Sequence, residues 1–118
     1  MKENENIQMP LDHKMICNII RDQHQGAIAS INQADLAAVS GIRKRRVRKI
    51  IKELIEQFGM PIGTLYTQAG GYFWITTKSE AEVSCKAISD HAISQLSRVA
   101  ALKKTTLRKY VGQLDLGT

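Results

Sequence analysis

The sequence predicts an α+β domain in which a small helical core is followed by a β-hairpin and then by one long helix. Three observations predict this class. Apolar residues recur at helical spacing in the first half of the chain, two β-prone runs then flank a pair of glycines, and helical spacing resumes near residue 79. With 118 residues and 43% hydrophobic content, the chain is long enough for one mainly aliphatic core. We expect a flexible N-terminal arm at 1–9, a domain at 10–77 and a C-terminal helical extension at 78–118.

Two helices and a short strand are predicted before residue 41. The first helix follows Pro10 and spans Leu11 to about Gln23, because apolar residues lie three or four positions apart there. Ala27–Ile31 is too short for a helix and suits a brief β-strand. Asn32 is a favourable N-cap for a second helix, Gln33 to about Val39.

A third helix is predicted after the break at Ser40–Ile42, where Gly41 permits a backbone conformation that branched residues resist. This helix starts at Arg43 or Lys44 and runs to about Phe58, with Gly59 as its stop. Its inward face carries apolar residues at steps of three, one, three and four: Val47, Ile50, Ile51, Leu54 and Phe58.

A β-hairpin is predicted from Pro61–Thr67 and Tyr72–Thr76, which are apolar and β-prone. The connecting residues end in Gly70 and Gly71, and paired glycines permit the positive φ angles of tight reversals. The alternation along Tyr72–Ile75 predicts that two of these side chains pack inward and two point outward.

The last predicted helix begins at Ser79, a plausible N-cap, and extends to about Tyr110. Glu80 and Glu82 lie in its first turn, where negative charge is favourable. An apolar stripe runs along it: Ala81, Cys85, Ile88, Ala92, Leu96, Val99 and Leu102. Both cysteines, Cys17 and Cys85, are expected to be reduced, buried thiols.

Positive charge is concentrated in the middle of the chain. The net charge is +6 and the pI is near 9.6. Residues 1–40 carry a net −2, residues 41–58 a net +5 and residues 59–118 a net +3. Clustered Lys and Arg favour a polyanionic partner, because they release the counterions condensed on phosphates.

The stretch Gln33–Leu54 resembles a helix-turn-helix unit. Ala37 falls where two crossing helices approach closely, Gly41 makes the turn, and Ile42 fills the angle between the helices. With a hairpin directly after it, the order of elements over Leu11–Thr77 is similar to that of the winged helix-turn-helix family, of the biotin-repressor and DeoR type. The resemblance implies that the second helix of the unit enters the major groove of double-stranded DNA while the first crosses the backbone.

A helical projection of the third helix sorts its basic residues. Arg45, Lys49 and Lys52 point most directly away from the core, with Arg46 and Arg48 on the flanks. Because an Arg fork can bond two acceptors of one guanine, we assign Arg45 and Arg46 to bases. The remaining predicted DNA contacts are to phosphates or come from the turn and the hairpin tip: Arg43, Lys44, Arg48, Lys49, Lys52 and Gln68.

The terminal helix has two interpretations: its stripe completes the core of one copy, or it pairs with a second copy. We favour a homodimer, since a helix of this length exceeds what a three-helix domain needs and since dimers match palindromic sites. The distal basic residues have no acidic residue between Asp90 and Asp115 and are alternative phosphate contacts or a site for an acidic partner: Arg98, Lys103, Lys104, Arg108 and Lys109.

An enzyme is not expected, because the three histidines are scattered and no His or Cys pair has metal-ligand spacing. We expect no cofactor, no metal, no small-molecule ligand and no membrane span, and a cytoplasmic location. The predicted function is sequence-specific DNA binding by a small transcriptional regulator. Small proteins of this type are common in phages and mobile elements, so the alternatives are an accessory factor in replication, packaging or recombination, or a protein-interaction module.

Overall fold

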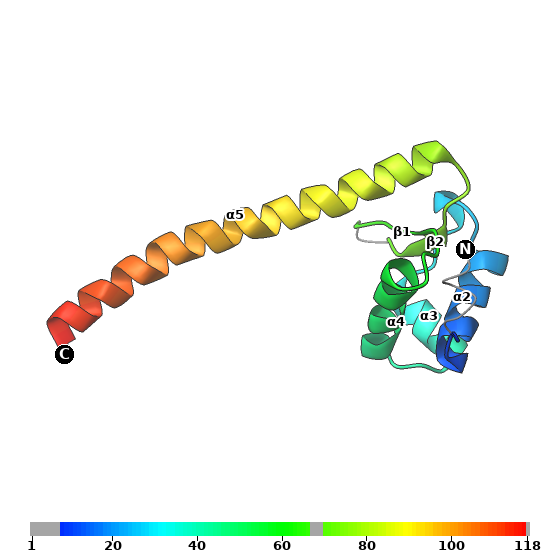
Figure 1. The fold of residues 1–118 in the computed structure, drawn as a ribbon, viewed down its shortest axis with the longest axis horizontal. Coiled ribbons are helices and arrows are strands. Elements are labelled where there is room, and N and C mark those ends of the chain that lie inside the picture. Colours follow the sequence, from blue (N-terminus) through cyan, green and yellow to red (C-terminus); the bar gives the residue numbers. More distant parts are fainter. Residues whose placement is uncertain (1–7, 67–69, 118) are drawn as a thin grey trace. The chain divides into compact units, whose positions relative to one another are not determined.

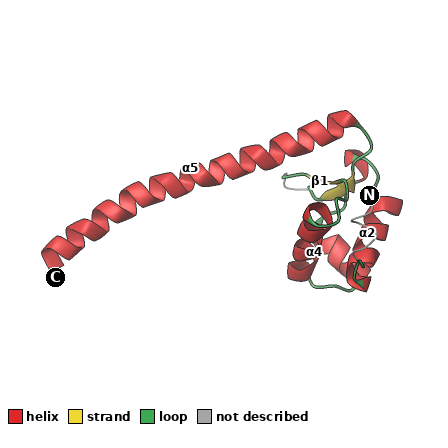
Figure 2. Cartoon of the chain, in the orientation of Figure 1, coloured by secondary structure: helices red, strands yellow, loops and turns green. Residues whose placement is uncertain are grey.

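The computed structural model describes residues 8–66 and 70–117, with side chains described as far as Thr105. It has the predicted α+β class, with helices before and after a two-stranded antiparallel hairpin (Figures 1 and 2). In chain order the elements are α2 (Leu11–Gln23), the 3-10 helix η1 (Ala27–Ala29), α3 (Gln33–Ser40), α4 (Lys44–Glu56), β1 (Ile62–Thr64), β2 (Tyr72–Trp74) and α5 (Lys78–Gly117). The chain forms two compact units, Met1–Ala87 and Ile88–Thr118.

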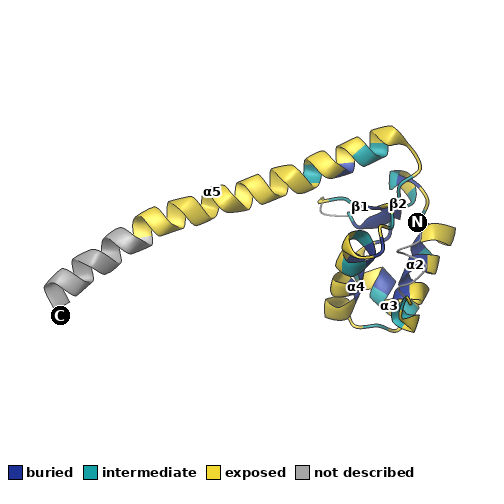
Figure 3. Ribbon diagram, viewed as in Figure 1, coloured by how far each residue is buried: buried dark blue, intermediate teal, exposed yellow. Residues whose placement is uncertain are grey.

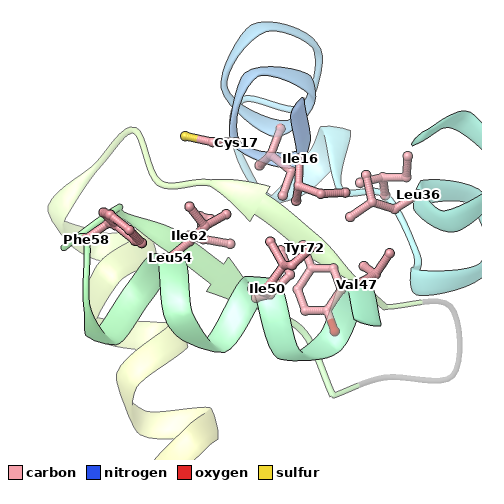
Figure 4. Close-up of a cluster of buried hydrophobic side chains, with 12 residues drawn as sticks. Ile16, Cys17, Leu36, Val47, Ile50, Leu54, Phe58, Ile62 and Tyr72 are labelled. Atoms are coloured by element: carbon pink, nitrogen blue, oxygen red, sulfur yellow. The ribbon is translucent and has the colours of Figure 1, made fainter. Parts of the chain in front are cut away.

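The core of the first unit lies between α2, α3, α4 and the hairpin (Figures 3 and 4). Ile16, Leu36 and Val47 are fully buried and come from three different helices. Burial of each such side chain contributes roughly 1.5–3 kcal/mol to folding. The remaining members of the buried cluster are Cys17, Ile20, Ile31, Ile50, Ile51, Leu54, Phe58, Ile62 and Tyr72.

The predicted helices before the hairpin are confirmed, with small changes at their ends. α2 has the predicted bounds, and the side chain of Asn32 caps α3 by accepting a hydrogen bond from Asp35 N (2.7 Å). α4 ends at Glu56, two residues before the predicted Phe58, which is nevertheless buried. A helix end is the feature that periodicity defines least well, because its last turn has no following residues to complete the pattern.

The predicted strand at Ala27–Ile31 is wrong over most of its length. The Ala29 and Ser30 amides donate to the Gly26 and Ala27 carbonyls, and these bonds close a turn of 3-10 helix. Within Ala27–Ile31, only Ile31 pairs with the hairpin, through reciprocal hydrogen bonds with Tyr72 of 2.8 and 2.9 Å. A five-residue apolar run does not distinguish these outcomes, because the partner that selects between them lies 41 residues away.

The hairpin is shorter than predicted, and its register pairs Ile62 with Trp74 and Thr64 with Tyr72. The side chains of β2 alternate as expected, since Tyr72 and Trp74 pack against the main cluster and Phe73 points to the other face, but Phe73 is buried as well. Tyr72 belongs to the main cluster beside α4, whereas the Phe73 ring lies over Gly63 of the paired strand. Both faces of β2 are therefore covered.

The role predicted for Gly71 is also wrong. Gly71 does not have a positive φ angle, in contrast to Gly26, Gly41 and Gly59. Gly71 is needed for a close approach instead, because a Cβ atom there would lie 2.0 Å from the carbonyl oxygen of Ile31. The missing side chain is what lets the hairpin pair with Ile31.

The start of α5 differs from the prediction by one residue, and its cap is Thr77 rather than Ser79. The Thr77 hydroxyl accepts a hydrogen bond from Glu80 N (3.1 Å). The Glu80 carboxylate in turn accepts from the amides of Thr76 and Ala27, both at 2.9 Å. Glu80 therefore fastens the first turn of α5 to the loop after α2.

These hydrogen bonds hold the pKa of Glu80 below its usual range, the Thr76 amide being the largest cause. Because this pKa is lower in the folded state, the ionised carboxylate stabilises the fold at pH values above the ordinary pKa of a glutamate. The stabilisation is lost as the pH falls through the lowered pKa. We expect Glu80→Gln to lower the urea midpoint of unfolding at pH 7, with a difference from wild type that shrinks toward pH 3. Urea titrations over this range test it, and an equal difference at both ends would contradict the role of the charge.

The two cysteines differ in exposure. Cys17 is buried as predicted, but Cys85 is exposed, so the prediction of two buried thiols is half wrong. Helical periodicity identified the apolar face of α5 without showing whether another element covers it. No helix in the described part of the chain is both long and apolar enough to cross a lipid bilayer.

Candidate nucleic-acid interface

The two faces of α4 have opposite character. Val47, Ile50 and Leu54 are fully buried on one side. The seven basic residues that the sequence assigned to DNA contacts in this region are all exposed: Arg43, Lys44, Arg45, Arg46, Arg48, Lys49 and Lys52. Arg43 immediately precedes the helix and the others lie on it. The eighth predicted contact, Gln68, lies outside the described residues.

A short turn fixes how α4 follows α3. Gly41 has φ +75° and ψ +12°, and its amide donates to the Ala37 carbonyl (2.9 Å), which ends α3 in a left-handed cap. The Ser40 hydroxyl accepts from Ile42 N (3.2 Å), and Gln33 Nε2 donates to the Lys44 carbonyl (2.9 Å). The first turn of α4 is thereby tied to the first residue of α3.

Ala37 and Ile42 both face the core. Both are partly buried and pack against the hydrophobic cluster. Ile42 therefore contacts the core from within the turn, as the sequence predicted.

Two polar contacts join α2 to α4, and neither was predicted. His13 Nε2 lies 2.7 Å from Glu53 Oε1, and the His13 ring meets Phe58 edge-on with centroids 5.9 Å apart. The hydrogen bond from His13 is the largest cause that lowers the pKa of Glu53, with smaller effects from Lys49 and Arg46. Since Glu53 is an ionised acceptor, Nε2 of His13 carries the hydrogen. The contact fixes one face of α4 against α2.

The second contact makes Arg46 less available for contact with DNA than the other basic residues of α4. Arg46 Nε donates to Asp12 Oδ2 (3.1 Å) across the two helices. Arg46 was assigned to base contacts, but part of its guanidinium is already bonded to a carboxylate. Lys52 has a looser partner, Glu56, at 3.9 Å.

Arg45 and Lys49 differ from these two residues. Within the described part of the chain, neither makes an ion pair. They are one helical turn apart on the exposed face, which makes them the strongest candidates for contact with a polyanion.

The surface beside the start of α4 is concave. A hollow of about 490 Å³ borders four of the basic residues, Arg43, Arg45, Arg46 and Lys49. Positive side chains around a concavity concentrate the local potential, so this surface can accept an anionic group.

The charge of Arg48, an exposed residue of α4, acts on Tyr72 of the hairpin. Burial raises the pKa of Tyr72, and the positive charge of Arg48 opposes that rise. Positive charge therefore continues from α4 toward the hairpin.

No group of three His, Cys, Asp or Glu side chains among the described residues is arranged to hold a metal ion. Comparison of the chain with protein-family models, curated proteins and solved structures found no match. The physical character of the α4 surface is therefore the basis for assigning a function.

Proposed function

We propose that this chain binds double-stranded DNA as a winged helix-turn-helix protein, with α4 in the major groove. The observation that carries the proposal is the pair Arg45 and Lys49, exposed and without ion pairs within the described residues, opposite the face of α4 that forms the core. An α-helix fits the major groove, and its N-terminal half meets base edges. In this mode α3 crosses the DNA backbone and β1–β2 forms the wing.

The basic residues of α4 fall into two roles in this proposal, base reading and phosphate contact. Arg45 reads a guanine through its planar guanidinium, which presents two N–H donors to the two acceptors of the base edge. The phosphate contacts come from Lys44, Arg48, Lys49 and Lys52. Arg46 must break its hydrogen bond to Asp12 before its Nε can contact DNA. The proposed role is that of a small sequence-specific regulator.

Fluorescence anisotropy with labelled oligonucleotides tests binding itself. We expect a duplex to bind at least tenfold more tightly than either of its single strands at physiological salt. The logarithm of the association constant is expected to fall with the logarithm of salt concentration with a slope of about −4, which corresponds to four or five phosphate contacts. Equal affinity for duplex and single strands would contradict the proposal.

Asp12 offers a prediction of tighter binding. Asp12→Asn removes the charge that holds Arg46 and leaves a side chain of similar shape, so we expect duplex affinity to rise about threefold, the scale of one surface ion pair. The salt slope should steepen by about one, since Arg46 then contacts a phosphate. The same titrations measure both quantities. Weaker binding by the variant would mean that Asp12 orients Arg46 for contact instead of competing with DNA.

A further inference from the structure

The distal part of α5 is exposed without interruption. Every residue from Ile88 to Thr105 is exposed, including large aliphatic side chains (Figure 3). Ile88, Leu96, Val99 and Leu102 are 42, 67, 47 and 63% exposed. At about 100° per residue, these four side chains lie within about 60° of one line along the helix, together with Ala81, Cys85 and Ala92. We call these seven residues the α5 stripe.

An apolar stripe on a helix is ordinarily covered, because helices in water gain most of their stability from packing such a face. The residues of the stripe beyond Ala87 are all exposed. The stripe therefore calls for a partner with a matching apolar face, and a second copy of α5 has one.

Charges near the stripe select the direction of pairing. Lys103 is 18 residues, or five turns, from Cys85 and so lies on the same line as the stripe. In a parallel pair the two Lys103 side chains would face each other, which is unfavourable. Glu82 and Lys104 lie on one flank of α5, about 33 Å apart along it. In an antiparallel pair, residues on the same flank of the two copies face each other.

We propose that the α5 stripe is an antiparallel homodimer interface, in which Ile88 of one copy packs on Val99 of the other, Cys85 packs on Leu102, and Glu82 pairs with Lys104. A single antiparallel register allows all three contacts to within one residue. Moving from Ile88 to Cys85 in one copy corresponds to moving from Val99 to Leu102 in the other, because the two helices run in opposite directions. An anionic surface would suit Lys103 and Lys104 but would repel Glu82 on the same flank. A second copy satisfies both signs of charge, so it is the favoured partner.

Disulfide trapping of the full chain tests the direction and the register. In the proposed dimer the two Cys85 residues are 17 residues, or about 26 Å, apart along the axis, far beyond the reach of a disulfide. Wild-type protein treated with diamide, which takes two hydrogen atoms from each pair of thiols, should therefore form no linked dimer. Leu102→Cys should form one, through Cys85 of each copy. Cys17 does not interfere, because it is 4% exposed.

The matched control is the double variant Cys85→Ser, Leu102→Cys. It should form no linked dimer, because the two introduced thiols are also about 26 Å apart in the proposed register. A linked wild-type dimer, a linked control, or no link in Leu102→Cys would each overturn the register.

Charge reversal followed by sedimentation is a second test that adds no thiol. Glu82→Lys and Lys104→Glu should each raise the dimer dissociation constant about tenfold, because each creates two like-charge contacts by symmetry. The double reversal should return the constant to within about threefold of wild type. A monomeric wild-type protein at micromolar concentration, or a double variant no better than the singles, would overturn the proposal. Both tests are made without DNA, so they are independent of the proposed function.

Discussion

Arg45→Ala is expected to reduce the affinity for a preferred duplex by about 10- to 100-fold, because a bidentate arginine–guanine contact contributes roughly 1–3 kcal/mol. The loss should be largest for the preferred sequence and small for an unrelated duplex, since Arg45 is proposed to read a base. Lys49→Ala should instead weaken binding to both duplexes by a similar factor and reduce the salt slope by about one.

The control for both variants is Lys78→Ala, which removes one positive charge from an exposed residue at the start of α5. Anisotropy titrations at two salt concentrations separate the effects. Losses of equal size for Arg45→Ala and Lys78→Ala would mean that net charge, and not the exposed face of α4, determines affinity. Because Arg45 and Lys49 are exposed, unfolding is not expected to complicate the comparison.

Gly71→Ala is expected to destabilise the fold by about 3 kcal/mol or more, the upper end of the range for overpacking. The new Cβ would meet the Ile31 carbonyl oxygen at 2.0 Å and Asn32 Cα at 2.6 Å. These are backbone atoms, so no side-chain rotation relieves the clash. The two hydrogen bonds between Ile31 and Tyr72 would have to lengthen or break. Urea unfolding followed by circular dichroism measures the loss.

Gly41→Ala is the matched control for crowding. Gly41 has a positive φ but nothing within 4 Å of the position that a Cβ would take, so its substitution costs only the strain of the left-handed conformation, about 1–2 kcal/mol. A smaller loss for Gly71→Ala than for Gly41→Ala would contradict the close approach of Gly71 to Ile31.

The helical elements and the candidate face of α4 could be predicted because their information is local. The apolar residues from Val47 to Leu54 repeat at helical spacing, which determines both the helix and the direction in which Arg45 and Lys49 point. The cap at Asn32 and the turn at Gly41 depend on residues within four positions. Such features could be predicted because the residues that determine them are close together in the sequence.

What the sequence did not reveal depends on residues far apart in the chain. Asp12 is 34 residues from Arg46, and His13 is 40 residues from Glu53, so no spacing rule connects them. Ile31 pairs with Tyr72, and that pairing explains why Gly71 must lack a side chain. Glu80 was assigned to a helix terminus by its position, but its bond to Ala27 arises only in the folded domain.

Selection from a pool of random duplexes at physiological salt tests most directly whether α4 reads base sequence. We expect an enriched motif that contains a guanine, and replacement of this guanine should weaken binding by the wild type much more than binding by Arg45→Ala. Binding without enrichment of any sequence would contradict this expectation, because a surface that only grips phosphates through Lys49 and its neighbours has no means of selecting one duplex over another.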